Sequence, residues 1–519
     1  MRTVTRRRAL AIIGAGVAAP LWASCGSGGV ETDQAVASTG PGPGRGPLHY
    51  MSLRDVARLI AARELSSVDL TQMMLDRIAA VDGRLRSYAT VMGEQAMAAA
   101  SAADAEIAAG TYRGPLHGVP VAVKDLCYTQ GVQTMGGLAV LSDFVPIYDA
   151  TVVSRLSAAG AVLLGKLNLT EGAMAAYHPD FDIPVNPWDP GLWPGVSSSG
   201  SGVATAAGLC FGSLGSDTGG SIRFPSAQCG LVGLKPTWGR VSRYGVLELA
   251  GSLDHIGPLT RTVADAAIMF EAIAGLDPDD PTSRPEPVLP ILDTLRTGVV
   301  GVRLGVDRAY TTTGVDPAVA GAIETVVETL VGLGAEAVEV TMPEAPLGDW
   351  GTICSYEAVR AHADTYPSRA GDYGPYFGQF LETGRGVTDV AYAEASARRG
   401  AFSERFDAML STVDALVCPT TTTALPLVDG MGYDTMGAFG QALASIAARF
   451  DPPLGGLTQF TAPADFAGTP TLSLPCGFSD AGAPYSMQLV GRELSEAILC
   501  RIAYAYEQAT DWHTRHPDV

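Results

Sequence analysis

One segment, residues 194–223, places a dense set of Gly and Ser residues next to apolar sequence. It reads PGVSSSGSGVATAAGLCFGSLGSDTGGSIR, and the apolar stretch GLVGLKP begins seven residues later, at position 230. A flexible Gly/Ser linker lies between polar segments, whereas the neighbours of this segment have the character of a buried core. Glycines in such a setting allow tight turns or bring backbone amides close to another group. We therefore expect this segment to be a working part of the folded body and not a linker.

Composition limits the kind of partner that the protein can bind. The chain has 519 residues, of which 47% are hydrophobic, so it can bury a large core and is expected to be globular. Its 54 acidic residues outnumber 34 basic ones, which gives a formal net charge of −20. That charge repels nucleic acid and anionic membrane surfaces. A small molecule is therefore the expected partner, with no nucleic acid.

The N-terminal residues 1–25 have the pattern of an export signal. They read MRTVTRRRALAIIGAGVAAPLWASC, a basic run followed by an apolar segment too short for a comfortable membrane span. TRRRAL, with Arg6 and Arg7, resembles a twin-arginine signal, and Cys25 resembles the lipid-modified cysteine of a bacterial lipoprotein. The alternative is a basic tail on a first core helix. The signal predicts an exported, extracytoplasmic protein, secreted or lipid-anchored, with no transmembrane span, and residues 26–47, rich in Gly and Pro, are expected to form a flexible linker.

Residues 48–519 show the alternation of helices and strands that is typical of an α/β protein. Two helices are expected after Ser52 and Ser66, because each Ser precedes an Asp by three residues, and a third over 93–109. A buried strand is expected to end at Lys124. Helix and strand alternate again over 150–168 and 298–340, which argues for a largely buried sheet. Residues 346–450 look mainly helical and suit the wall of a substrate pocket inserted into this body.

Several enzyme chemistries are excluded by the motifs that the chain lacks. It has neither the GxSxG of α/β hydrolases nor the GxxxxGK[ST] of phosphate-binding loops. Its seven histidines show no metal-ligand spacing, so we expect no metal and no cofactor. Seven cysteines after Cys25 are widely spaced and are expected to be buried free thiols: Cys127, Cys210, Cys229, Cys354, Cys418, Cys476 and Cys500.

A serine nucleophile with a base other than His remains. Lysine can act as the base where burial lowers its pKa, and Lys124, at the end of an apolar strand, meets that need best among the lysines. Judged from its own neighbourhood alone, Lys124 is better explained as a lysine that extends its amine to solvent or forms an ion pair.

Three separated segments resemble those of the amidase signature hydrolases. GVPVAVKDL is similar to the family's lysine motif, PGVSSSGSGVATAAG to its first serine motif and GSDTGGSIRFPSAQCGLVGLKP to its nucleophile motif. The resemblance continues through SLDHIGPLTRTVADAA, DALVCPTTTT and GTPTLSLPCGFSDAGAPYSMQLVGRELSEAILC and covers roughly residues 50–510. It implies the amidase signature fold, in which helices cover both faces of a large central, mixed and mostly parallel sheet.

The resemblance also assigns roles to residues. It makes Ser221 the nucleophile, Lys124 the general base and Ser197 the proton relay between them, with the Val196–Ser197 peptide bond cis. The backbone amides of Thr218, Gly219, Gly220 and Ser221 would bind the oxyanion. Three further residues are expected to support the site and not to react: Ser198 would orient Ser197, and Asp217 and Arg223 would hold the turn rigid through an ion pair or backbone hydrogen bonds. We also expect structural roles for Ser199 and His255.

The resemblance implies a hydrolase that cleaves carboxamide C–N bonds through a serine acyl-enzyme, and that can also attack aryl esters or carbamates. One alternative is the amidase subunit of a glutamine-dependent amidotransferase, and another is a catalytically silent binding lipoprotein. Pocket walls are expected from residues 125–140, 170–195 and 346–450. Aromatic residues in these ranges suit a neutral, apolar or aromatic substrate, although core packing explains them equally well; they include Tyr177, Phe181, Trp188, Trp193, Tyr356, Tyr373 and Phe377.

Overall fold

The computed structural model describes residues 46–519, which form one compact unit. The expected export signal, Cys25 and all but the last two residues of the expected linker lie outside the described residues. Within the described part of the chain, no helix combines the length and the apolar character that crossing a membrane requires. The seven cysteines from Cys127 to Cys500 are free and buried, as expected from their apolar surroundings.

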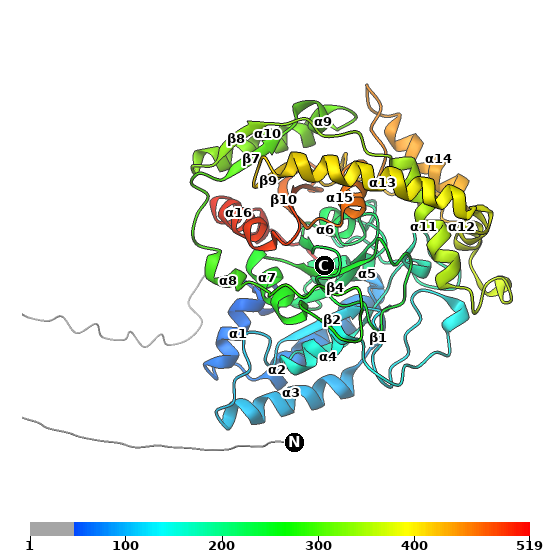
Figure 1. Cartoon of the computed structure of the whole chain (residues 1–519). Helices are drawn as coiled ribbons and strands as arrows, with labels where there is room; N and C mark the ends of the chain where they lie inside the picture. The colour runs from blue at the N-terminus through cyan, green and yellow to red at the C-terminus, as the bar shows by residue number, and fades with distance from the viewer. Residues whose placement is uncertain (1–45) are drawn as a thin grey trace, which may run out of the picture. The chain divides into compact units, whose positions relative to one another are not determined.

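A single sheet of eleven strands forms the centre of this unit (Figure 1), in the order β1-β3-β2-β4-β6-β5-β10-β11-β9-β7-β8. The strands are β1 (Tyr88–Val91), β2 (Pro120–Lys124), β3 (Val162–Leu167), β4 (Gly212–Asp217), β5 (Val232–Lys235), β6 (His255–Thr260), β7 (Arg303–Val306), β8 (Glu336–Glu339), β9 (Ala415–Pro419), β10 (Thr471–Phe478) and β11 (Pro484–Val490). Every residue of the central strands β2, β3, β4, β5 and β6 is buried, including the polar residues that β4 and β6 contain.

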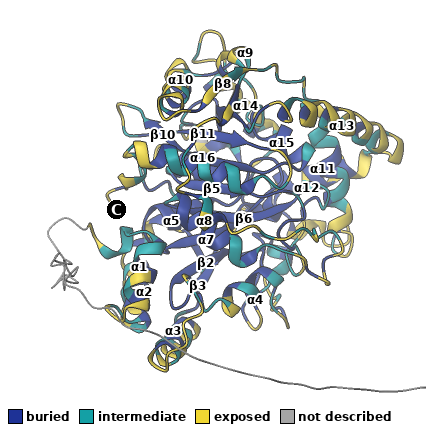
Figure 2. Cartoon of the chain, turned by 60° about the vertical axis from the view of Figure 1, so that its left-hand side comes forward, coloured by how far each residue is buried: buried dark blue, intermediate teal, exposed yellow. Residues whose placement is uncertain are grey.

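Helices surround the sheet and expose only their outer faces (Figure 2). They are α1 (Leu53–Ala61), α2 (Ser67–Leu85), α3 (Gly93–Ala108), α4 (Thr151–Ala158), α5 (Ser199–Ala206), α6 (Arg223–Cys229), α7 (Val263–Ile273), α8 (Ile291–Thr294), α9 (Arg308–Thr312), α10 (Pro317–Gly332), α11 (Leu347–Ala361), α12 (Pro375–Gly386), α13 (Asp389–Leu410), α14 (Met436–Ala447), α15 (Ala462–Ala467) and α16 (Glu496–Ala509). Helices α5 and α6 pack against each other and the sheet, and α16 packs against α7, α10 and β10. The expected α/β class with a mixed, helix-covered sheet is confirmed.

The expectation that most strand pairs are parallel is wrong. Only four pairs are parallel, namely β2–β3, β2–β4, β7–β8 and β7–β9. The six others are antiparallel and include the middle of the sheet from β4 through β6, β5, β10 and β11 to β9. β10 and β11 form a hairpin, β5 and β6 pair without an intervening helix, and β4 and β5, which α6 connects, are not neighbours in the sheet.

Local sequence signals account for several elements. The side chains of Ser52 and Ser66 accept hydrogen bonds from the amides of Asp55 and Asp69, so both expected N-caps are present. The expected third helix is α3, and the strand expected to end at Lys124 is β2. The mainly helical range 346–450 contains α11, α12, α13 and α14, but β9 interrupts it and joins the sheet between β11 and β7.

The parallel pairing of β2 with β4 brings two important segments together. Val123 pairs with Leu214, so the two strands run side by side in the same direction. Their carboxyl ends, Lys124 and Asp217, therefore lie at the same edge of the sheet, which is where α/β proteins form their sites. The residues that follow β4 lead through the turn at 218–222, which we call the Ser221 turn, into α6.

Candidate active site

Lys124 is fully buried and surrounded by hydroxyl groups. Its Nζ donates to Ser197 Oγ at 2.7 Å, to Ser198 Oγ at 2.9 Å and to Ser216 Oγ at 2.8 Å. None of the ion pairs within residues 46–519 involves Lys124. Burial therefore lowers its pKa to about 7 from the model-compound value of 10.5, because a low-dielectric environment disfavours the charged ammonium. A lysine in this state can accept a proton near neutral pH.

The first serine motif supplies two of these hydroxyls. The Val196–Ser197 peptide bond is cis, as the resemblance implies. Ser198 Oγ also accepts from the amide of Ser216 at 3.2 Å and donates to its carbonyl at 3.1 Å, so Ser198 joins this motif to the end of β4. Ser199 instead accepts from the hydroxyl of Tyr177 at 2.6 Å, away from Lys124, in agreement with a structural role.

Ser221 lies in the Ser221 turn beside the first serine motif. It is 8% exposed, whereas Ser197 is fully buried. Within residues 46–519 no hydrogen bond joins the hydroxyls of Ser197 and Ser221; the two segments are linked through the amide of Ser198, which donates to the carbonyl of Ser221 at 3.4 Å. The structure thus brings Lys124 and Ser197 into direct contact and places Ser221 next to them, at the surface of a cavity.

Asp217 and Arg223 hold the two ends of the Ser221 turn. Arg223 donates to both carboxylate oxygens of Asp217, from Nη2 at 2.9 Å and from Nε at 3.0 Å, and both side chains are fully buried. Burial alone would raise the pKa of Asp217, but the Arg223 guanidinium holds that pKa well below its usual range. Arg223 also bonds Asp465 Oδ2 at 2.8 Å and the carbonyl of Thr461 at 2.9 Å. The expected ion pair is therefore present, and it extends to α15.

The backbone amides of the Ser221 turn are not equivalent. The amide of Gly220 donates to Asp217 Oδ1 at 2.6 Å and is therefore already committed. The amides of Thr218, Gly219 and Ser221 donate to no acceptor within the described residues. Two carbonyls of the turn are also fixed: Thr461 Oγ1 donates to that of Gly219 at 2.6 Å, and Trp350 Nε1 to that of Thr218 at 2.9 Å. Three amides thus remain able to bind a negatively charged oxygen.

His255 lies behind this turn and does not take part in a Ser–His pair. Its Nδ1 lies 3.2 Å from the carbonyl oxygen of Asp217, its partner in the β4–β6 ladder. Burial lowers its pKa well below the ordinary value, so the ring is neutral. This position agrees with the structural role expected for it.

A mainly apolar cavity of about 280 Å³, which we call the Ser221 cavity, opens over Ser221. It is lined by Ala173, Met174, Ala175, Val196, Thr218, Gly219, Ser221, Phe224, Leu249, Trp350, Tyr376, Phe439, Leu443, Leu457 and Thr458. The expected ranges 170–195 and 346–450 contribute to the wall, and 125–140 does not. The aromatic residues singled out from the sequence do not line this cavity; Tyr177 and Trp193, for example, belong to a buried core cluster beside it.

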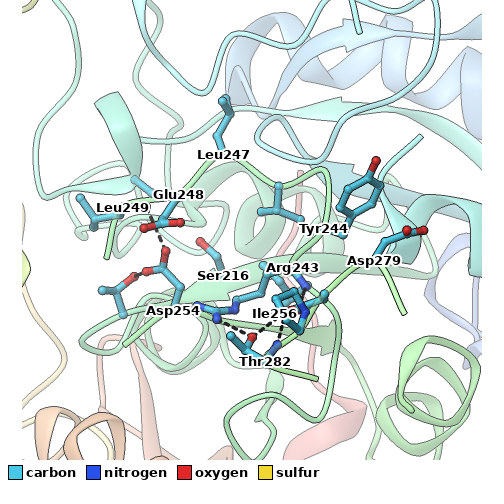
Figure 3. Close-up of a pocket in the computed structure, with 15 residues that line it drawn as sticks. Ser216, Arg243, Tyr244, Leu247, Glu248, Leu249, Asp254, Ile256, Asp279 and Thr282 are labelled. Carbon is cyan, nitrogen blue, oxygen red and sulfur yellow. Dashed lines mark hydrogen bonds between the residues drawn. The ribbon is translucent and has the colours of Figure 1, made fainter. Parts of the chain in front are cut away.

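A second cavity, the Ser216 cavity, has a volume of about 210 Å³ and a more polar wall (Figure 3). Ser216, Asp254 and Arg243 face the same space in this view. The Ser216 and Ser221 cavities share Ala173, Thr218 and Leu249 as lining residues. Lys124 therefore has a hydroxyl neighbour, Ser216, that lines the cavity adjacent to the one over Ser221.

Sequence reasoning missed three residues of this site. Ser216 had a usable signal, because it lies near the end of the strand that runs parallel to the one carrying Lys124. Trp350 and Asp465 contact the Ser221 turn and its flanking Arg223 from distant positions later in the chain. Nothing in their local sequence indicates that contact.

Comparisons with known proteins agree with this geometry. The chain matches the model of the Amidase family over residues 69–500. It is 47% identical, over 90% of its length and 96% of the relative's, to a protein of Mycobacterium tuberculosis provisionally named amidase AmiD. It is 39% identical to the A-type subunit of the glutamyl-tRNA(Gln) amidotransferase of Moorella thermoacetica, over 91% of this chain and 99% of that one. The native peptide amidase of Stenotrophomonas maltophilia superposes with a TM-score of 0.77 at 32% identity, over 90% of this chain and 98% of that structure. The chain belongs to the amidase family.

Proposed function

We propose that this protein hydrolyses carboxamide C–N bonds through an acyl-enzyme formed on Ser221. The main support for the proposal is the state of Lys124. This lysine is buried, its pKa is about 7, and its Nζ contacts Ser197, whose neighbour Ser198 is hydrogen-bonded to Ser221. A buried lysine without a carboxylate partner is costly, and general-base catalysis gives that arrangement a use. Membership of the amidase family supports the same reaction class.

In the proposed mechanism, protons move along Ser221, Ser197 and Lys124. Neutral Lys124 accepts the Ser197 hydroxyl proton while Ser197 accepts that of Ser221, and Ser221 Oγ forms a bond to the amide carbon. The C–N bond then breaks, and the amine leaves with the proton returned through Ser197. Water attacks the resulting ester in the same way, which releases the acid and restores the Ser221 hydroxyl. The mechanism requires the Ser221 hydroxyl to turn toward Ser197 when substrate binds.

The oxyanion of the tetrahedral intermediate would lie against the amides of Thr218, Gly219 and Ser221. These amides are free of protein acceptors within the described residues, whereas that of Gly220 is held by Asp217. Preorganised amides of this kind stabilise the charge that develops on the carbonyl oxygen and need no further rearrangement. We therefore restrict the oxyanion hole to three of the four amides first considered.

We propose a substrate with a neutral, apolar or aromatic acyl group. The Ser221 cavity has an apolar wall that includes Phe224, Tyr376, Phe439 and Leu443, and about 280 Å³ accommodates a group of one aromatic ring. An aryl ester of the same acid would be attacked by the same residues, and so would an aryl carbamate whose carbamoyl group has a similar size. The peptide amidase that resembles this chain supports small amides as the substrate class.

Hydrolysis of a small panel tests the proposal. The panel comprises an aryl amide, an aryl ester and the free carboxamide of one aromatic acid, together with an aryl carbamate of similar size, assayed with the full chain and with Ser221→Ala. We expect turnover by the wild type, none by Ser221→Ala, and an acyl adduct on Ser221 detectable by mass spectrometry. Ser201→Ala is a matched control, because the buried Ser201 hydroxyl donates to the carbonyl of Leu214 and lines neither cavity. A wild type that turns over no member of the panel would contradict the proposal.

The amidase subunit of a glutamine-dependent amidotransferase is the second candidate. The 39% identity to a subunit of the glutamyl-tRNA(Gln) amidotransferase favours it, and the export signal proposed for residues 1–25 argues against it. The two functions differ in substrate, since this alternative requires hydrolysis of L-glutamine and stable association with further subunits. A binding lipoprotein without catalytic activity would leave the entire panel intact while retaining a ligand.

We also propose that the protein is exported through its twin-arginine-like N-terminus, with Cys25 as the site of a lipid anchor. The basic run and short apolar segment of residues 1–25 support this. Fractionation of cells expressing the full chain tests it, with Arg6→Lys together with Arg7→Lys as the export-defective control and Cys25→Ala as the control for anchoring. Recovery of the wild type inside the cell would contradict the export proposal.

A further inference from the structure

Trp350, a residue of the cavity wall, is hydrogen-bonded to the backbone of the Ser221 turn. It lies on α11, lines the Ser221 cavity, and donates from Nε1 to the carbonyl oxygen of Thr218 at 2.9 Å. No other side chain of the helices α11 to α14 donates to or accepts from this turn within the described residues. Trp350 is therefore the direct polar link between the helical wall and the segment that carries Ser221.

The carbonyl that Trp350 holds belongs to the same peptide unit as the Gly219 amide. In a planar trans peptide the C=O and the N–H point in opposite directions. Fixing the Thr218 carbonyl therefore fixes the direction of the Gly219 N–H, which is one of the three free amides of the turn within the described chain. The indole also packs closely against Gly219, because a Cβ at that position would lie 2.8 Å from the Trp350 ring.

Further hydrogen bonds hold both partners of this contact in place, namely α11, which carries Trp350, and residue Thr218. Helix α11 is anchored by Glu357, whose carboxylate accepts from the amide of Ser252 at 2.9 Å and from its hydroxyl at 2.7 Å. The Thr218 hydroxyl donates to Asp254 Oδ1 at 2.6 Å, which holds the same residue from its side chain. A displacement of α11, which forms part of the cavity wall, would therefore reach the Thr218–Gly219 peptide unit through the indole of Trp350.

We propose that Trp350 is a positioning residue that aims the Gly219 N–H at the oxyanion and couples it to the packing of the acyl group. An acyl group in the Ser221 cavity contacts the indole, so a group that fits holds the ring and its hydrogen bond in place. A group too small to contact the ring lacks that support. Discrimination between acyl groups then affects kcat more than KM. This inference rests on the proposed amide hydrolysis at Ser221.

Two replacements in the full chain separate the hydrogen bond from the ring. Replacement of Trp350 by 3-benzothienyl-alanine keeps a bicyclic ring and removes the N–H, and Trp350→Phe removes the N–H and part of the ring. We expect the first to lower kcat about tenfold with KM unchanged within about threefold, the loss of one hydrogen bond that acts in the transition state. Trp350→Phe should lower kcat similarly and also raise KM for aromatic acyl groups. Trp238→Phe is the matched control, because its indole donates to the carbonyl of Gly251 at 3.2 Å and lines neither cavity.

Inhibitor binding gives a second measurement, which would not change if Trp350 had only a structural role. An aldehyde to which Ser221 adds, forming a hemiacetal, places an oxygen in the oxyanion hole, and the matching alcohol does not. The 3-benzothienyl-alanine variant should bind the aldehyde about tenfold more weakly and the alcohol equally well. An active wild type whose 3-benzothienyl-alanine variant retains full kcat and aldehyde affinity would overturn the role of Trp350 alone. A wild type that hydrolyses no amide would overturn this inference together with the proposed function.

Discussion

The Nζ of Lys124 lies 2.7 Å from the Oγ of Ser197, and both side chains are fully shielded from solvent. With Ser198 and Ser216 the amine has three hydroxyl partners, while a neutral amine has only two hydrogens to donate. In the neutral state at least one of these hydroxyls must therefore donate to the nitrogen. The arrangement can hold the lysine in either protonation state, and this is what a proton-transfer group requires.

Activity should fall in acid as Lys124 becomes charged. Its pKa of about 7 is lowered by burial, so the neutral base predominates above that pH and the ammonium below it. We expect kcat/KM to reach a plateau above pH 7 and to fall about tenfold per pH unit well below it. Initial rates with a neutral amide between about pH 5 and 9 give this profile. Lys124→Met should lose about 10³-fold in kcat/KM and retain no such acid limb; an identical profile in that variant would assign the titration to another group.

The three hydroxyls around Lys124 should differ in importance. Ser197→Ala removes the proposed relay and should lower kcat by about 10²–10⁴-fold. Ser216→Ala removes one hydrogen bond to Lys124, and Ser198→Ala removes one to Lys124 and two to the backbone of Ser216; each should lower kcat about tenfold or less. Single-turnover acylation rates of the three variants provide the comparison. Equal losses at all three positions would argue that Ser197 only positions the lysine.

Loss of Arg223 should destabilise the fold as well as the site. Arg223→Met leaves the carboxylates of Asp217 and Asp465 buried without their cation. Breaking a buried ion pair in this way costs about 3–5 kcal/mol of unfolding free energy. Urea-induced unfolding measures the loss. Arg398→Ala breaks the exposed pair with Asp349, at 2.7 Å, and should cost far less; similar losses for both variants would contradict the structural role of the buried network.

Glu171 should make stability depend on pH. Its carboxylate is buried and accepts from the amide of Gly374 at 2.9 Å, where α12 begins. Burial raises its pKa to about 7 from 4.5, so the folded state holds the proton more tightly than the unfolded state. Its contribution is complete below about pH 4.5 and is lost as the pH rises through 7, a loss on the order of 3 kcal/mol. Glu171→Gln should therefore be more stable than the wild type at about pH 8.5 and similar at about pH 4. Unfolding curves that differ by the same amount at both pH values would contradict this assignment.

Filling the Ser221 cavity should change which acyl groups react. Leu443 lies on its wall, on α14, and Leu443→Trp places a larger ring in a space of about 280 Å³. We expect kcat/KM for an aromatic acyl amide to fall at least about tenfold, because overpacking of this kind typically costs about 1–3 kcal/mol. The rate with an acetyl amide should change much less. Gln441→Trp, at an exposed position of the same helix, is the control, and an unchanged ratio of the two substrates in Leu443→Trp would place the acyl group elsewhere.

The sequence predicts the parts of this molecule that depend on local pattern. The N-caps at Ser52 and Ser66, the strand that ends at Lys124 and the buried Gly/Ser segment are of this kind. The family resemblance adds the neighbourhood of Lys124 and Ser197 and the cis bond before Ser197. The sheet shows the limit of this reasoning. Alternation of strands and helices predicts parallel pairs for strands that a helix connects, and it does not predict how the other strands pair.

The rest depends on contacts between segments far apart in the chain. Trp350 reaches Thr218 across 132 residues, and Asp465 reaches Arg223 across 242. The aromatic part of the cavity wall also depends on such contacts: Tyr177, Trp193, Tyr376 and Phe439 belong to one buried cluster, but only Tyr376 and Phe439 of these four line the Ser221 cavity. Residue type alone cannot distinguish these pairs, since the difference lies in how the helices are placed.

The contacts of Arg223 with residues far along the chain also have a consequence for the synthesis of the protein. Its partners Thr461, Asp465 and Gln488 all belong to the C-terminal part of the chain. A nascent chain that stops before residue 460 already contains Lys124, Ser197 and Ser221, together with Asp217 and Trp350, but it lacks Thr461 and Asp465, which bond the Gly219 carbonyl and Arg223. The full set of contacts around the turn can form only after residues 461–488 have been synthesised. A product truncated before this segment carries Lys124, Ser197 and Ser221 without the contacts that complete the packing of the turn.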